Sequence, residues 1–410
     1  MRVLFVTMPI VPHFYPMAAL AWAFRAAGHD VRVAGQPAIH KVVTGAGLPA
    51  VSIGDGYNPE EDMMTTLRSL SSGVEEIARF GMDDVLNLPD RLRRRFTEAR
   101  IAPFVRLAEV MARDLVAFVE FWKPDLIISD PLIFAAPIAA EISGVPLVRN
   151  LWGPDVIARM NFPGQSMTGM GHLQDWWPED LVELYRSFNV KVRSNYAAAS
   201  IDPCPTSLQL PGVPNRVPMR YVPYNGSGVL PSWLTEHNDR RRVCVTWGTS
   251  TTRLLGESGF LVPQILDALR GVDVEVVLAI GEPDRHLIAD STGVRIVENL
   301  PLNLLLPTCS LLVHPGGAGT MLTAATLGVP QVILPQIADQ HVNAAQLAAT
   351  GAGVNIPPGS YQEGIETAIR ECLSERRFNE SARRLRRDML GQPTPASVVE
   401  QLLALEPYLP

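Results

Sequence analysis

The sequence predicts an α/β protein of two domains, each built on a parallel β-sheet. Three observations support this fold class. The chain has 410 residues, more than one compact core of ordinary size usually contains. Short β-branched runs alternate with longer helical stretches, which is the pattern of βαβ units. The alternation fails between residues 203 and 228, where prolines and glycines accumulate as they do in interdomain linkers.

The first half of the chain contains the strands of an N-terminal domain. We predict that this domain spans residues 1–212. The runs RVLFVTMP (2–9) and DVRVAG (30–35) predict strands on either side of a helix. DLIISD (125–130) predicts another buried strand, which ends before Pro131. We predict that an interdomain linker follows this domain over residues 213–228.

The second half repeats the pattern, and we predict a C-terminal domain over residues 229–392. Its strands are predicted at RRVCVTWGT (241–249), VEVVLAIG (274–281), VRIVENL (294–300), SLLVHP (310–315) and QVILP (331–335). The tail, 393–410, predicts a short amphipathic helix whose apolar face can pack back on the N-terminal domain.

The composition argues against several classes of protein. The net charge of −7 and the pI of about 5.7 disfavour a nucleic-acid binder, which needs a basic face. No uninterrupted apolar stretch reaches the ~20 residues that a membrane span requires. The cysteines are far apart and show no CxxC spacing, so we expect a cytoplasmic protein without disulfides or structural zinc.

The most informative segment is HPGGAGTMLTAATLGVPQVILPQIADQ, from His314 to Gln340. The preceding SLLV predicts a buried strand that delivers His314 to the crevice above the sheet, where open α/β folds bind ligands. Gly316, Gly317 and Gly319 let the backbone approach a ligand, and a helix beginning near Gly317 aims unpaired N–H groups at it. We therefore predict an anion site, most simply for a phosphate, to which His314 adds a donor.

Two more pairs of polar residues follow strands of the same predicted sheet. Thr249 and Ser250, in VTWGTS, have hydroxyls and amides that could contact the same phosphates. Asp339 and Gln340 follow QVILP and have the chemistry to hold sugar hydroxyls. Asp339 is equally well placed as a helix N-cap, and the two roles are compatible.

These motifs resemble the nucleotide-sugar signature of GT-B glycosyltransferases. The likeness is closest to the bacterial branch that glycosylates polyketides and other natural products, which is related to the UDP-glycosyltransferases. MRVLFVTMPIVPHFYPMAALAWAFRAAGHDVRVAG is the matching N-terminal signature, and the resemblance covers nearly the whole chain. It implies the GT-B fold, with two Rossmann-like domains whose parallel sheets face a central cleft. The N-terminal domain would bind the acceptor, and the C-terminal domain the activated sugar.

The resemblance implies donor-binding roles for three groups of residues. The residues expected to bind the diphosphate are His314, Gly316, Gly317, Gly319 and Thr320, assisted by Thr249 and Ser250. The sugar pair is Asp339 and Gln340. The nucleobase group is Asn299, Leu300 and Pro301.

Catalysis of sugar transfer to a hydroxyl needs a base that titrates near neutrality. His13 fits by type and place, in the loop predicted after the first strand; the alternative is a histidine that only packs. The resemblance implies that Asp130 orients its imidazole. Phe14 and Trp152 are the best candidates to line an apolar acceptor pocket, in a chain whose middle region is rich in Met and aromatic residues.

The predicted reaction is the inverting transfer of a deoxysugar to an apolar natural product such as a polyketide aglycone. The donor expected for the bacterial branch is a dTDP-linked sugar. No two aspartates are separated by a single residue, so the DxD motif with which many GT-A enzymes hold a metal is absent. We therefore predict no metal and no cofactor besides the nucleotide-sugar co-substrate.

The sequence is also compatible with two other functions. One is a nucleotide-sugar epimerase of the GT-B fold, which would have acidic groups around the sugar and no apolar acceptor pocket. The other is a non-catalytic helper subunit, which the intact glycine loop, Asp339, Gln340 and His13 disfavour. The partners left open are a separate activating protein, which some relatives need, and a second copy of the chain in a homodimer.

Overall fold

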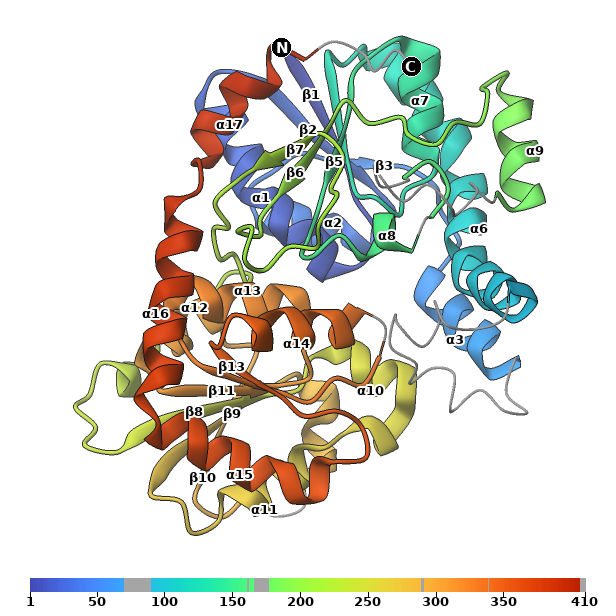
Figure 1. The fold of residues 1–410 in the computed structure, drawn as a ribbon. Helices are drawn as coiled ribbons and strands as arrows, with labels where there is room; N and C mark the ends of the chain where they lie inside the picture. The colour runs from blue at the N-terminus through green and yellow to red at the C-terminus, as the bar shows by residue number, and fades with distance from the viewer. Residues whose placement is uncertain (70–89, 161, 166–176, 289–290, 338, 406–410) are drawn as a thin grey trace.

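The computed structural model describes residues 1–69, 90–160, 162–165, 177–288, 291–337 and 339–405. Within them the chain forms two α/β domains, one above the other in Figure 1, with parallel sheets in both. The predicted fold class is confirmed. In this part of the chain, no helix is both long enough and apolar enough to cross a membrane.

The N-terminal domain contains, among the described residues, a seven-stranded parallel sheet in the order β3-β2-β1-β4-β5-β6-β7. Its strands are β1 (Arg2–Val6), β2 (Asp30–Gly35), β3 (Ala50–Ser52), β4 (Leu126–Ser129), β5 (Leu147–Asn150), β6 (Ala199–Asp202) and β7 (Arg216–Pro218). Its helices are α1 (Val11–Ala26), α2 (Pro37–Gly45), α3 (Pro59–Ser69), α6 (Asp90–Trp122), α7 (Ala135–Ser143), α8 (Val156–Arg159) and α9 (Glu179–Ser187). The chain order reverses between β1 and β4, which makes this the switch point of the sheet.

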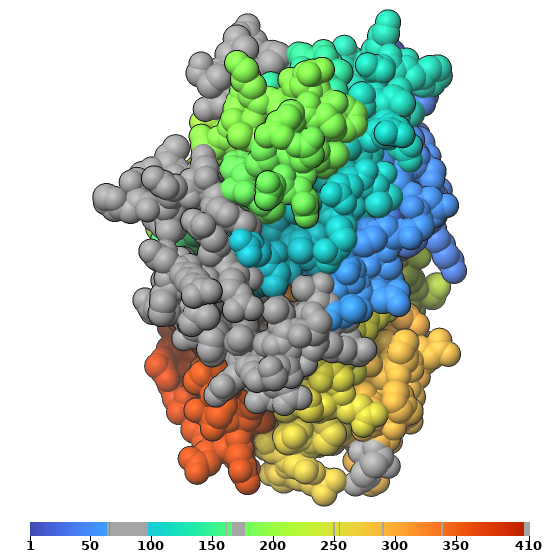
Figure 2. Space-filling view, turned by 90° about the vertical axis from the view of Figure 1, so that its right-hand side faces the viewer, coloured from blue at the N-terminus to red at the C-terminus, as the bar shows by residue number. Residues whose placement is uncertain are grey.

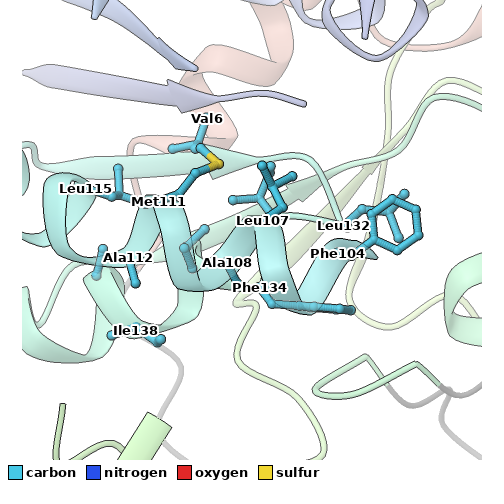
Figure 3. Packing of buried hydrophobic residues seen from close by; sticks show 14 of the residues in the cluster. Val6, Phe104, Leu107, Ala108, Met111, Ala112, Leu115, Leu132, Phe134 and Ile138 are labelled. Atoms are coloured by element: carbon cyan, nitrogen blue, oxygen red, sulfur yellow. The ribbon is translucent and has the colours of Figure 1, made fainter. Parts of the chain in front are cut away.

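The long helix α6 forms much of the core on one face of this sheet. Its buried residues recur with helical periodicity, at Phe104, Leu107, Ala108, Met111, Ala112 and Leu115. Figure 3 shows this stripe packed between Val6 of β1 and Ile138 of α7. The same apolar cluster includes Val6 of β1 and Ile127 of β4, the strands after which His13 and Asp130 follow in the chain.

The C-terminal domain contains, in its described part, a six-stranded parallel sheet in the order β10-β9-β8-β11-β12-β13. Its strands are β8 (Arg241–Thr246), β9 (Val274–Ile280), β10 (Val294–Glu298), β11 (Leu311–His314), β12 (Gln331–Ile333) and β13 (Gly353–Asn355). Its α-helices are α10 (Thr249–Leu255), α11 (Val262–Leu269), α12 (Leu302–Leu305), α13 (Ala318–Leu327), α14 (Asp339–Ala349), α15 (Tyr361–Ser374) and α16 (Arg376–Gly391). The 3-10 helices are η1 (Ser232–Leu234), η2 (Gly256–Gly259), η3 (Glu282–Leu287) and η4 (Leu306–Thr308). In this sheet the chain order of the strands reverses between β8 and β11.

The last helix, α17 (Pro395–Leu402), returns to the N-terminal domain after α16 and lies along α1 (Figure 1). Thr394 caps it by accepting a hydrogen bond from the Ser397 amide at 3.2 Å. Val398, Val399 and Leu402 are buried in the apolar cluster around α1. The C-terminal tail therefore joins the two domains a second time.

The linker begins later than predicted. Within the predicted segment 213–228, Arg216–Pro218 form β7, which pairs with β6 at the edge of the N-terminal sheet. The prolines of this stretch indicated a loop, but an edge strand tolerates proline because one side of its backbone needs no partner. The connection to β8 therefore starts at residue 219.

Candidate active site

A cavity of about 760 Å³ lies between the two domains. Its walls include residues that follow β1 and β4 in the N-terminal domain and residues that follow β8 and β11 in the C-terminal domain. Both switch points thus face the same space, which is where ligands bind in open α/β sheets.

His13 lines this cavity from the first turn of α1, and not from a loop as we predicted. Proline is compatible with a helix at its first positions, where the backbone N–H has no partner in any case, so Pro12 is tolerated as the second residue of α1. His13 Nδ1 lies 2.7 Å from Asp130 Oδ2. The Leu132 amide donates to Asp130 Oδ1 at 2.8 Å and holds the carboxylate in place. Because Nδ1 is engaged by Asp130, Nε2 is the nitrogen available to a ligand.

The electrostatic surroundings of His13 favour its protonated form. Burial lowers the pKa of the imidazole, but the charge and hydrogen bond of Asp130, with the charges of Asp339 and Glu60, outweigh this effect. The net result is a pKa above the ordinary value of 6.5. His13 therefore has the properties of a base that accepts and holds a proton close to neutral pH.

Trp152 and Phe14, the two predicted aromatic contacts, have different outcomes. Trp152 lines the cavity and packs on His13, with ring centroids 4.4 Å apart. Phe14 is fully buried in the core around α1 and does not reach the cavity, so its predicted role is wrong. The reason is that Phe14 is adjacent to His13 in a helix, where successive side chains point about 100° apart. Other apolar lining residues are Ile10, Met63, Phe104, Leu132, Val156, Ile157, Met160 and Phe162.

The opposite wall is the N-terminus of α13. Gly317 is the N-cap, and Gly317, Gly319 and Thr320 line the cavity. A Cβ placed on Gly317 would meet no atom within 4 Å, so the space in front of this residue is open. Unpaired N–H groups and the positive end of the helix dipole face that space, as in an anion site.

Gly316 and His314 lie behind this wall and not on it. Gly316 has φ +101°, and a Cβ there would lie 2.9 Å from Ile333 Cγ2, so internal packing requires the glycine. His314 is fully buried: its Nδ1 accepts a hydrogen bond from the Gly316 amide at 3.1 Å, and Nε2 lies 2.9 Å from Gln331 Oε1. Burial lowers the pKa of His314 to about 4, although the Gln331 hydrogen bond raises it. The predicted direct contact of His314 with a diphosphate is corrected accordingly: the neutral imidazole shapes the loop.

Substitution of His314 distinguishes direct contact with a diphosphate from support of the loop at Gly316. Loss of the Gly316 hydrogen bond in His314→Ala should weaken binding of thymidine diphosphate by about 2- to 10-fold, the usual worth of one bond. In His314→Asn, the side-chain oxygen can accept from the amide two residues on, so affinity should stay near the wild-type value. Calorimetric titration measures both. Equal loss in the two variants, with unchanged melting temperatures, would indicate direct contact between the imidazole and the phosphate.

Asp339 and Gln340 line the cavity at the start of α14. Burial raises the pKa of Asp339 overall, although His13, Asn343 and Arg100 lower it. Asn343 donates to Asp339 Oδ2 at 3.1 Å and to the Gly316 carbonyl at 2.9 Å. Gln340 is partly engaged: its Oε1 accepts from the amides of residues 336 and 337, and Nε2 donates to Thr251 Oγ1 at 3.0 Å. Asp339 is thus the more available of the two for a sugar hydroxyl.

The nucleobase group is only partly in the cavity. Asn299, whose φ of 55° is left-handed, and Leu300 line it. Pro301 is buried as the N-cap residue of α12 and packs against Gly228, so its predicted contact with a base is wrong. Thr249 and Ser250 begin α10, but their side chains lie outside the described part of the structure. Their neighbours Gly248 and Thr251 line the cavity.

Several lining residues were not predicted. Glu60, in the first turn of α3, forms an ion pair at 3.1 Å with Arg253 of α10, which joins the domains at the edge of the cavity. Figure 2 shows that side, with α3 in blue above the yellow part of the C-terminal domain. The linker contributes Tyr224, Asn225, Gly226 and Ser227. No sequence signal marks these residues, because they reach the cavity only through the domain arrangement.

The described residues contain no group of three or more His, Cys, Asp or Glu side chains arranged to hold a metal ion. The four cysteines, Cys204, Cys244, Cys309 and Cys372, are not in disulfides.

Comparison with known proteins identifies the class. Family models for the N- and C-terminal domains of erythromycin biosynthesis protein CIII-like proteins match residues 22–248 and 263–405. A 10-deoxymethynolide desosaminyltransferase of Streptomyces venezuelae is 37% identical, over 98% of this chain and 96% of its own. An aclacinomycin-T 2-deoxy-L-fucose transferase of Streptomyces galilaeus is 35% identical, over 98% and 95%. A spinosyn rhamnosyltransferase solved with thymidine diphosphate has a TM-score of 0.79 and 30% identity, over 98% of this chain and 100% of that one.

The fold is that of a GT-B glycosyltransferase, and the relatives are glycosyltransferases, which confirms the resemblance seen in the sequence. The chain belongs to the erythromycin biosynthesis protein CIII-like family.

Proposed function

We propose that this enzyme transfers a deoxysugar from a dTDP-linked donor to an apolar, polyketide-type aglycone, with inversion at the anomeric carbon. The proposal includes no metal ion and no cofactor. One observation carries it: the His13–Asp130 pair and the N-terminus of α13 face one cavity from opposite domains. The named substrates of the relatives and the thymidine diphosphate in the spinosyn enzyme support the choice of donor and acceptor.

The chemistry is a single displacement. The acceptor hydroxyl gives its proton to His13 Nε2 while its oxygen bonds to the anomeric carbon. The bond from that carbon to the diphosphate breaks, and its electron pair leaves with the phosphate oxygen. Asp130 stabilises the imidazolium through Nδ1–H. The N–H groups at the start of α13 stabilise the growing negative charge on the diphosphate. Because base and leaving group occupy opposite walls, attack from the side opposite the leaving group inverts the carbon.

The two parts of the cavity match the two substrates. Polar groups, among them Gly317, Thr320 and Asp339, gather on the C-terminal side, where the donor would lie. The N-terminal side is lined mostly by aliphatic and aromatic side chains around Trp152, as expected for an apolar ring system. A volume of about 760 Å³ lies within the range of sites for small organic ligands.

The nucleotide preference can be tested by thermal shift with the diphosphates of thymidine, uridine, adenosine and guanosine. A ligand that binds only the folded protein stabilises it by about 2.7 kcal/mol at 100 times its Kd. We expect thymidine diphosphate to raise the melting temperature most. A larger shift with any of the other three diphosphates would contradict the proposed donor.

A further inference from the structure

Gly153 lies where the two domains touch, in the turn that follows β5 and Trp152. The residue is buried, and a Cβ built on it would lie 2.7 Å from Ala318 Cβ at the start of α13. Ordinary contacts between carbon atoms are about 3.5–4.0 Å. Only glycine therefore permits the N-terminal domain to come this close to the donor-site helix.

The turn around Gly153 is fixed to the N-terminal domain. The Asp155 amide donates to Gln209 Oε1 at 2.8 Å, and Asp155 Oδ1 accepts from the Ala158 amide at 3.1 Å. The other oxygen of Asp155 pairs with Arg149, and both side chains of this pair are buried. A clash at Gly153 is thus not easily relieved by movement of the turn.

The opposing surface is fixed as well. Ala318 is the first residue of α13, directly after the loop that His314 and Asn343 hold through Gly316. A second contact lies nearby, where Gln346 of α14 donates to the Gln209 carbonyl at 3.2 Å. With both surfaces held internally, an added atom between them moves one domain away from the other.

Such a displacement would move the His13 wall relative to the donor-site helix. Trp152, adjacent to Gly153, packs on His13, and Ala318 directly follows Gly317, the N-cap of that helix. The Gly153–Ala318 contact therefore connects the wall that holds His13 to the wall that would hold the donor.

We propose that Gly153 is a positioning residue that sets the closest approach of the two domains, and with it the distance between His13 and a donor bound at α13. This inference rests on the proposed function for the placement of donor and acceptor. Gly153 itself touches no substrate, because it acts through its contact with Ala318.

The first test is the Gly153→Ala variant. Because a misplacement of about 1 Å can cost about 10²-fold in rate, we expect kcat to fall by about that factor. The Kd of thymidine diphosphate should change less than about twofold, because the C-terminal domain supplies its site. Turnover is measured as thymidine diphosphate release from dTDP-rhamnose, with 10-deoxymethynolide and aklavinone as acceptor probes. Gly391→Ala, at an exposed helix end where a Cβ meets nothing within 4 Å, is the matched control and should match the wild type.

The decisive variant is the double substitution Gly153→Ala with Ala318→Gly, which removes the opposing methyl group. It should regain at least about tenfold of the lost kcat, since the clash between the two Cβ atoms is gone. A wild-type kcat in Gly153→Ala, or a loss that Ala318→Gly does not restore, would overturn the proposal. If Gly153→Ala alone failed to fold, recovery of folding and turnover only in the double variant would support it, and failure of both would reject it. The single and the double variant are compared by their total turnover. The result therefore does not depend on which residue is the base.

Discussion

Replacement of His13 by Ala is expected to lower kcat by about 10²–10⁴-fold, the usual worth of a general base. The imidazole faces the acceptor side and is held by Asp130, so its loss should leave the Kd of thymidine diphosphate nearly unchanged. Turnover and calorimetric affinity measured on the same preparation separate the two effects. Wild-type turnover with a hydroxyl acceptor would remove His13 from the mechanism.

The pH profile provides an independent check on the same residue. The base must be unprotonated, so kcat/KM should rise with pH through the pKa of His13, which lies above its ordinary 6.5. This limb should be absent in His13→Ala. In Asp130→Asn the raising effect of the carboxylate is lost, and the limb should move to lower pH while activity falls. A limb that stays in place in Asp130→Asn would show that it belongs to another group.

The second large effect is expected at the phosphate site. In Gly317→Val the new side chain projects into open space in front of α13, where the diphosphate is expected. The backbone there, with φ −58° and ψ 134°, accommodates valine, so the fold should be preserved. We expect the Kd of thymidine diphosphate to rise by about 10- to 100-fold, corresponding to the 1–3 kcal/mol of an overpacked site.

Two further variants make this result interpretable. Gly317→Ala adds one methyl group and should give an intermediate loss of affinity. Gly391→Val places the same side chain at an exposed helix end with free space around it and should bind as the wild type does. Unchanged affinity in Gly317→Val, measured by calorimetry on protein with a normal melting temperature, would mean that the phosphates bind elsewhere.

The sequence predicted best what depends on local pattern. Alternating strands and helices predicted the two sheets, and the ends of DLIIS and SLLVH placed Asp130 and the α13 loop at the carboxyl edges of those sheets. Parallel strands all present their carboxyl ends to the same edge, so residues distant in the chain converge there without any special signal.

The features of the site that the sequence did not predict depend on the direction of side chains and on contact between the domains. A motif match could not show that His13 lies in the first turn of a helix, which directs Phe14 into the core. It also could not distinguish Gly317, which faces the cavity, from Gly316, which packs against β12. The contributions of Glu60 and Gly153 arise where one domain meets the other, and no spacing within the sequence encodes that contact.

In the proposed reaction the cleft performs a direct displacement on a dTDP-sugar, and the protein alone provides the base and the charge stabilisation. The anomeric configuration of the glycoside formed from dTDP-rhamnose and an accepted aglycone, determined by NMR with EDTA present throughout, tests both parts of this mechanism. We predict full transfer activity under chelation and a product whose anomeric configuration is the inverse of the donor's. A product of retained configuration, or activity that is lost with EDTA and restored by Mg²⁺ or Mn²⁺, would contradict a metal-free inverting displacement.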